Sequence, residues 1–185
     1  MESNLIKPYR LLADNTNFEH EKKDNIRETF FLVSDYMKSV GGQGMCHLMS
    51  SVFYVLLREQ DIICELCIGE AQDDLYTFDH SWITINGKIF DIAIQSTLIG
   101  KRNPPIYADN DLGSELTTTR KYGIIAKGLD SQARKVIDTP FSDYLTGAPG
   151  KQWKVIKQIG RKLGLRLEIE PLKDKYKETK RVYVK

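Results

Sequence analysis

The sequence predicts an α+β domain in which an apolar helix packs on an antiparallel sheet. Two segments before residue 60 have apolar residues at helical spacing, and residues 62–94 are rich in strand-forming types. Asn86-Gly87 joins two of the strand-like runs, and Asn-Gly in that position is a strong hairpin signal. Helices followed by a hairpin-bearing sheet are typical of the α+β class.

The first helix is expected to begin at Asp24, a favoured helix-capping type, and to end at Gly41-Gly42. Its apolar positions recur at helical spacing: Ile26, Phe30, Val33 and Met37. A second helix over about 45–60 is apolar almost all round, which predicts a central helix covered on several sides. The polar residues 1–23 are expected to wrap the surface.

Three strands should follow, over 62–71, 77–85 and 88–94. A two-residue turn at Asn86-Gly87 makes Ile85 face Lys88, so the same register sets His80 opposite Ala93 and Trp82 opposite Asp91. His80 and Asp91 are then diagonal neighbours on one face, about 7–8 Å apart. A slip of one residue would place them on opposite faces.

Residues 100–150 contain many turn formers and predict irregular structure with a helix over 131–137. An amphipathic helix over 151–163 and a closing strand over 165–169 are expected next. No linker is visible, so we expect residues 1–185 to form a single domain. Within it we expect a core over about 24–100 and a C-terminal elaboration over 101–185.

Composition excludes several classes of protein. Three cysteines among 185 residues do not fit a secreted disulfide scaffold, and the chain start lacks a signal peptide, so we expect a cytoplasmic protein. The longest apolar run, Val52 to Leu57, is far short of the ~20 residues that span a bilayer. No membrane span is therefore expected.

Charge is distributed unevenly along the chain. Residues 151–185 contain twelve Lys and Arg against four Asp and Glu, whereas residues 1–150 are net acidic. Such a basic segment is able to bind nucleic acid, an anionic lipid surface or an acidic partner protein. Because no aromatic interleaving or nucleic-acid motif accompanies the charge, we favour a solvated basic helix and strand, and nucleic acid is not an expected partner.

Cys46 stands where a helix is predicted to begin, and a helix N-terminus favours the thiolate. The preceding Gly41-Gly42-Gln43-Gly44 leaves backbone amides open, which suits an oxyanion hole, and Gln43 adds a side-chain donor. The simpler interpretation of Cys46 is a small buried hydrophobe.

The hairpin supplies candidate partners for Cys46. His80 is a possible base and Asp91 a possible orienting carboxylate, in the order that thiol catalysis requires. The alternatives are a core histidine bonded to backbone and a strand-end carboxylate. His47 is a poor rival base because adjacent helix residues do not face each other. His20 is expected on the surface.

Metal and cofactor chemistry find little support in the sequence. Cys64 and Cys67 spell C-x-x-C, but residues three apart on a strand point to opposite faces, so a shared zinc is not expected. The sequence contains no nucleotide-binding glycine motif and no H-E-x-x-H helix. We expect neither a metal nor a cofactor.

The segments GGQGMCHLMSSVFYVLL and DHSWITINGKIFDIA, within about residues 40–95, resemble the transglutaminase-like superfamily. The resemblance implies a papain-like core, with Cys46 as nucleophile, His80 as general base and acid, and Asp91 orienting His80. Gln43, Gly44 and Trp82 are then candidates for oxyanion and substrate positioning. His47 replaces the tryptophan that often follows the cysteine in that family. Arylamine N-acetyltransferases share the Cys, His, Asp order, but their Arg-Gly-Gly and Cys-x-Glu surroundings are missing here.

Three functions are consistent with these residues. The first is cysteine-dependent acyl transfer or hydrolysis on an amide bond of a protein, a peptide or a small amide, including an isopeptide bond or a glutamine side chain, through a thioester. The second is a binding module on the same fold without activity. The third is N-acetyltransferase-like acyl transfer.

Overall fold

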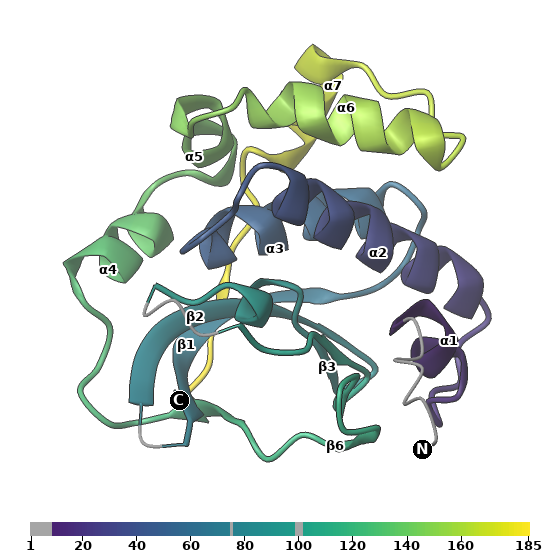
Figure 1. Ribbon diagram of the computed structural model, residues 1–185. Helices are drawn as coiled ribbons and strands as arrows, with labels where there is room; N and C mark the ends of the chain where they lie inside the picture. The colour runs from purple at the N-terminus through teal and green to yellow at the C-terminus, as the bar shows by residue number, and fades with distance from the viewer. Residues whose placement is uncertain (1–8, 75, 99–101) are drawn as a thin grey trace.

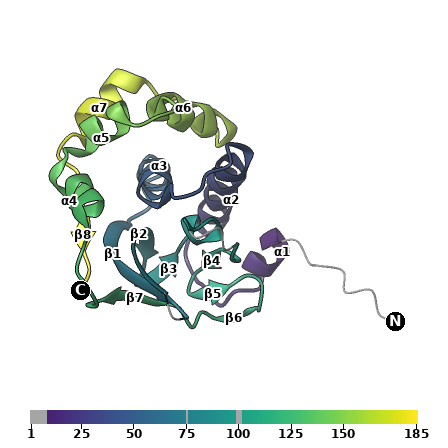
Figure 2. The ribbon, with the colours of Figure 1, turned by 60° about the vertical axis from the view of Figure 1, so that its left-hand side comes forward.

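A computed structural model describes residues 9–74, 76–98 and 102–185. Figures 1 and 2 show a sheet on one side, α2 and α3 against it, and α5 to α7 as an outer layer, so that α3 is enclosed on several sides. The helices are α1 (Tyr9–Asp14), α2 (Lys23–Ser39), α3 (Cys46–Arg58), α4 (Ser131–Asp138), α5 (Phe141–Gly147), α6 (Gln152–Lys162) and α7 (Ile169–Tyr176), with a 3-10 turn η1 (Ala93–Gln95).

The main sheet has the order β3-β2-β1-β7, with β8 also paired to β1. Its pairings are antiparallel except for β1 with β8, which run parallel. The strands are β1 (Glu65–Asp73), β2 (Tyr76–Ile85), β3 (Lys88–Phe90), β7 (Lys121–Ile124) and β8 (Val182–Tyr183); a small second sheet comprises β4 (Ile106–Tyr107), β5 (Asn110–Asp111) and β6 (Leu116–Thr117). The predicted α+β class with an antiparallel sheet is confirmed.

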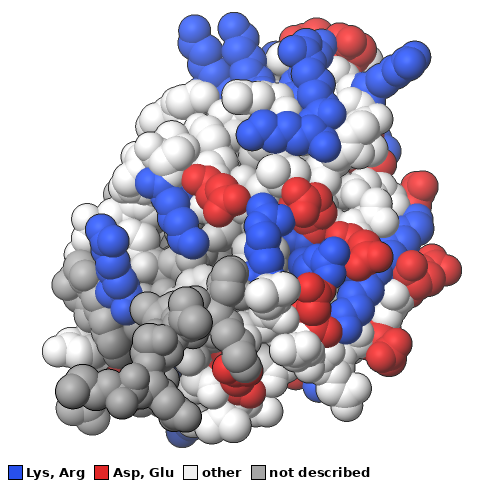
Figure 3. Space-filling view, turned by 45° about the vertical axis from the view of Figure 1, so that its right-hand side comes forward, with Lys and Arg blue, Asp and Glu red and all other residues white. Residues whose placement is uncertain are grey.

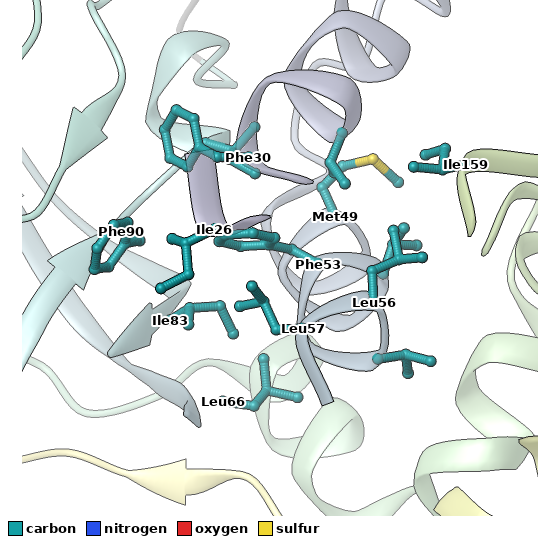
Figure 4. Close-up of a cluster of buried hydrophobic side chains, with 14 of the residues drawn as sticks. Ile26, Phe30, Met49, Phe53, Leu56, Leu57, Leu66, Ile83, Phe90 and Ile159 are labelled. Carbon is teal, nitrogen blue, oxygen red and sulfur yellow. The ribbon is translucent and has the colours of Figure 1, made fainter. Parts of the chain in front are cut away.

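The apolar α3 is the centre of the hydrophobic core. Phe53, Leu56 and Leu57 are buried between the strands and the neighbouring helices, as Figure 4 shows. Full burial of such a side chain contributes about 1.5–3 kcal/mol. The same cluster extends from Leu12 to Tyr176. The core therefore fixes α3 firmly, and with it the helix start that carries Cys46.

The start of α2 differs from the prediction. The helix begins at Lys23, and Asp24 lies in its first turn beside Arg27 instead of capping it. The turn before the helix is closed by His20, whose Nδ1 accepts the backbone N–H of Lys22 and whose carbonyl accepts that of Lys23. At the other end Gly41 has φ +65° and the N–H of Gly42 returns to the carbonyl of Met37, so the predicted glycine stop is confirmed.

The β2–β3 hairpin has the predicted register, with Ile85 opposite Lys88 and Ile83 opposite Phe90. The third strand, expected to reach residue 94, ends at Phe90. Asp91 is responsible, because its Oδ1 accepts the N–H groups of Ala93 and Ile94 and turns the chain into η1. Ala93 consequently does not pair with β2.

Other predicted boundaries need correction. The strand expected over 62–71 runs over Glu65–Asp73, and the segment 100–150 contains strands and α5 besides the predicted α4. The strand expected over 165–169 is absent from the described residues. Leu167 is buried against Gly160 of α6, and its segment leads into α7 rather than into a sheet. Packing against α6 therefore replaced strand pairing there, while the helix predicted over 151–163 is confirmed as α6.

Across the described ranges, none of the helices has the length and apolar character needed to cross a bilayer.

Candidate active site

A cavity of about 700 Å³ opens at the start of α3. Cys46 and His47 line it from the helix, His80 from β2 and Ala93 from η1. Loop and helix residues between 127 and 144 form much of the remaining wall, including Lys127, Asp130 and Tyr144. The structure thus places the predicted nucleophile and base together at an accessible hollow.

His80 and Asp91 form the contact that the hairpin register predicted. His80 Nε2 lies 2.8 Å from Asp91 Oδ2, and both side chains are almost fully buried. The turn at Asp91 brings the carboxylate to the ring, although β3 has already ended. With Nε2 directed at Asp91, Nδ1 is the ring nitrogen left for Cys46.

Tyr122 is a site residue that the sequence analysis missed. Its hydroxyl donates to Asp91 Oδ2 at 2.7 Å. Burial and the negative charge of Asp91 raise the pKa of Tyr122 well above its ordinary value, so the hydroxyl keeps the proton that it donates. Tyr122 comes from β7, within a segment predicted as irregular, and no local sequence signal marks it.

Cys46 is held as a thiolate. Burial by itself raises the pKa of the Cys46 thiol, but the charge and hydrogen bonds of His47 and His80 more than offset this and lower the pKa to about 5. Part of the residue stays exposed to solvent. A partly exposed cysteine with a low pKa is the form that reacts as a nucleophile.

His80 carries the complementary charge. Burial by itself lowers the pKa of His80, while the charge and hydrogen bond of Asp91, together with the Cys46 thiolate, raise it to about 10. Between these values the sulfur is negative and the ring positive. Such a pair is able to attack a carbonyl carbon and then deliver a proton to the leaving group.

The position of His47 departs from the sequence argument. Adjacent helix residues usually diverge, yet His47 lines the same cavity as Cys46, and its charge contributes to lowering the pKa of the Cys46 thiol. Its Nδ1 lies 2.8 Å from the Ser81 hydroxyl, which directs the ring toward β2. At the first residues of a helix no preceding turn restricts the side chains, so the usual divergence does not apply.

The glycine-rich approach shapes the helix start. Gly44 lines the cavity with φ +67°, and a side chain at this position would collide with Leu98. Its N–H donates to the carbonyl of Ser96. The first α3 bonds run from Leu48 and Met49 to Met45, so the N–H groups of Cys46 and His47 precede the helical hydrogen bonds and are candidate donors to an oxyanion.

Gln43 and Trp82 lie away from the thiol. The Gln43 amide donates to the carbonyls of Thr97 and Leu98, and its residue lines an adjoining cavity of about 440 Å³. Trp82 is 2% exposed and packs on the ring of Tyr122 at 5.0 Å between centroids. Trp82 therefore supports the tyrosine that holds Asp91 and does not line the cavity.

The cavity wall includes more carboxylates than ammonium groups: Glu70, Asp73, Asp79 and Asp130 against Lys127. Glu70 accepts three backbone N–H groups of residues 126–128, and those of Lys127 and Ala126 do most to hold the pKa of Glu70 below its ordinary value. Asp79 accepts the N–H of Asp130, and Asp130 in turn caps α4. The carboxylates thus fix the loop over the site and give the cavity a negative character.

The other two cysteines have different surroundings. Burial raises the pKa of Cys64 to about 12 and that of Cys67 to about 11. In the described part of the chain, no three His, Cys, Asp or Glu side chains are grouped so as to hold a metal ion.

The basic C-terminal segment forms a separate surface. Figure 3 shows Lys and Arg side chains projecting at the top of the molecule, where α6 and α7 lie in Figure 1. Several are paired with acids nearby, among them Lys157 with Glu168 and Lys175 with Glu59. None of the α6 or α7 residues lines the Cys46 cavity.

Comparisons with protein-family models, with curated proteins and with solved structures find no match for this chain.

Proposed function

We propose that the protein is a papain-like, transglutaminase-like cysteine enzyme that transfers the acyl group of an amide to water or to an amine. Cys46 is its nucleophile, His80 its general acid and base, and Asp91 the residue that orients His80. The observation that carries this proposal is the Cys46–His80–Asp91 arrangement at the cavity, with an imidazolium beside a thiolate.

The reaction begins when the Cys46 thiolate attacks the carbonyl carbon of the amide. The carbonyl oxygen becomes an oxyanion, which the N–H groups at the start of α3 stabilise. His80 gives its proton to the leaving nitrogen, the C–N bond breaks, and a thioester on Cys46 remains. Asp91 keeps the His80 ring oriented throughout, because its Oδ2 also receives the Tyr122 hydroxyl.

The second half restores the enzyme. Neutral His80 takes a proton from water or an amine as that molecule attacks the thioester carbonyl. The new tetrahedral intermediate expels the Cys46 thiolate, and His80 is again an imidazolium. Water yields the carboxylic acid, and an amine yields a new amide.

The cavity wall favours some substrates over others. Glu70, Asp79 and Asp130 set a negative potential around the thiol, with Lys127 as a basic counterpart. An acyl donor rich in phosphate groups is repelled there, which disfavours an N-acetyltransferase reaction using such a donor. A neutral or basic peptide amide suits the cavity better.

The test is formation of an acyl-enzyme from p-nitrophenyl acetate, followed by mass spectrometry, together with turnover of peptide amides. We expect one acetyl group on Cys46 in the native chain, none in Cys46→Ala, and undiminished acylation in the matched control Cys64→Ala. Addition of hydroxylamine separates transfer from hydrolysis, because transfer produces a hydroxamate. Acylation that persists in Cys46→Ala contradicts the proposal, and a chain that is never acylated and never turns over an amide is a binding module.

A further inference from the structure

His47 has a fixed place at the site that the proposed triad does not use. Its Nδ1 is 2.8 Å from the hydroxyl of Ser81, which is fully buried. The imidazole itself is partly exposed and lines the cavity beside Cys46. The bond to a buried hydroxyl therefore fixes the ring at the cavity that Cys46 lines.

Two consecutive residues of α3 meet two consecutive residues of β2. Cys46 interacts with His80, and His47 is bonded to Ser81. Ser50, one turn further along the helix, donates its hydroxyl to the carbonyl of Ser81 at 2.8 Å. The helix start is thereby tied to the strand at one point, and this tie sets the sulfur and both imidazoles relative to one another.

We propose that His47 is a positioning residue of the thiol: anchored by Ser81, its ring keeps the Cys46 sulfur ionised independently of His80. This inference rests on the proposed function of Cys46. In a site with a single imidazole, loss of that ring removes the charge that stabilises the thiolate, and the cysteine becomes a neutral thiol. Here the loss of His80 removes proton transfer while a second ring still stabilises the thiolate.

The electrostatics agree with this arrangement. The contributions of His47 that lower the pKa of Cys46 exceed those of His80. The other titratable groups around this cavity are Asp79 and His80 on β2, Glu70 and Asp73 on β1, Tyr76 at the start of β2, Lys127 and Asp130 in the covering loop, and Tyr144 on α5.

The experiment is the pH dependence of Cys46 alkylation by iodoacetamide in the native chain, His47→Gln, His80→Gln and the double variant, read by peptide mass spectrometry. We expect a midpoint near the pKa of about 5 in the native chain. His47→Gln should raise the midpoint by about one pH unit or more. His80→Gln should abolish acyl turnover yet keep the midpoint below that of the double variant, which should reach about 8.5 or higher.

An unchanged midpoint in His47→Gln overturns the proposal, because a purely structural residue would not move the ionisation of the sulfur. A midpoint in His80→Gln that equals that of the double variant overturns it as well, since His47 would then contribute nothing alone. Alkylation needs no substrate, so a native chain that has the low midpoint but never turns over an amide refutes the proposed function and leaves this inference standing.

Ser81→Ala tests the anchor while both histidines remain. We expect its midpoint to rise by less than that of His47→Gln and in the same direction. A midpoint equal to that of the native chain refutes anchoring by Ser81. Circular dichroism and thermal unfolding of each variant confirm that the fold is retained, so that a shifted midpoint reports on the site.

Discussion

The cysteine at the start of α3 and the two cysteines around the start of β1 are all at least partly buried, yet they have opposite properties. Burial penalises the thiolate in both places, and at β1 it prevails, raising the pKa of Cys64 to about 12 and that of Cys67 to about 11. At α3 two imidazoles reverse the same penalty and lower the pKa of Cys46 to about 5. The partners of a buried cysteine, and not its burial, therefore decide whether it is reactive.

Asp91→Asn is the change expected to reduce the reactivity of the α3 site most strongly, and so to remove most of its difference from the thiols at β1. The four groups bonded to Asp91 are all donors: the N–H groups of Ala93 and Ile94, the Tyr122 hydroxyl and the protonated His80. In Asp91→Asn, the side-chain NH2 group replaces one of the two oxygens. Whichever oxygen it replaces, a hydrogen-bond donor then faces another donor. We expect acyl turnover to fall by about 10²–10⁴-fold, the range associated with loss of a general acid and base.

Steady-state kinetics of Asp91→Asn measure this fall, and Asp109→Asn is the matched control. Asp109 binds the N–H of Ile89 and the ammonium of Lys88, away from the cavity. Its variant should keep native turnover. Native turnover in Asp91→Asn would show that His80 needs no carboxylate.

Competitive alkylation at pH 7 should sharpen the contrast between the thiols. With pKa values of about 5 and about 11, the thiolate fraction of Cys46 exceeds that of Cys67 by about 10⁴-fold. The lower nucleophilicity of a weakly basic thiolate offsets about three powers of ten of this advantage. We expect Cys46 to be labelled at least about tenfold faster, and equal labelling of the two peptides would contradict the assignment.

The pH profile of acyl turnover should have two limbs. Activity rises as Cys46 ionises, through a pKa of about 5, and falls as His80 loses its proton, through a pKa of about 10. The active form, a thiolate beside an imidazolium, exists between them. Initial rates across this range measure both limbs, and a profile that keeps rising above pH 10 would mean that the imidazolium is not required.

Tyr122→Phe is expected to have a smaller effect on the chemistry than Asp91→Asn. Loss of the hydroxyl leaves Asp91 with fewer donors, so its charge acts more strongly on His80 and moves the alkaline limb to higher pH. The free energy of unfolding should fall by about 1.5–3 kcal/mol, as for other buried hydrogen bonds to charged groups. Chemical denaturation and the rate profile measure the two effects.

Thr84→Val is the corresponding test for the thiol of β1, because Thr84 on β2 contacts Cys67. Burial raises the pKa of Cys67, and the Thr84 hydroxyl, 3.8 Å from Cys67 Sγ, acts in the opposite direction and lowers it. Removal of this hydroxyl should make Cys67 still less reactive and leave Cys46 unchanged. An effect of Thr84→Val on Cys46 alkylation would mean that the two thiol regions are not independent.

Local patterns were sufficient for the elements nearest the site. The apolar period placed α3, Gly41-Gly42 marked the end of α2, and Asn86-Gly87 determined the hairpin register that joins His80 to Asp91. Each of these depends on residues close together in the chain. Their geometry follows from backbone preferences that single residue types express strongly.

The failures of sequence reasoning occur where another contact outweighs strand pairing. Leu165 to Ile169 has the composition of a strand but packs against α6, and the strand predicted to reach residue 94 stops because Asp91 binds two backbone groups. Burial at a helix surface and a local carboxylate contact each outweigh strand propensity, which is weak and depends on context.

The sequence by itself determined that a cysteine begins the central helix and that a hairpin register brings a histidine and an aspartate close together. Only the tertiary structure decided which groups surround them: Tyr122, 31 residues beyond Asp91, donates its hydroxyl to the carboxylate, and Ser81 holds the His47 ring. Register and helix starts are set by short-range backbone geometry. Charge stabilisation depends on which distant side chains burial brings within a few ångströms, and no local pattern encodes that.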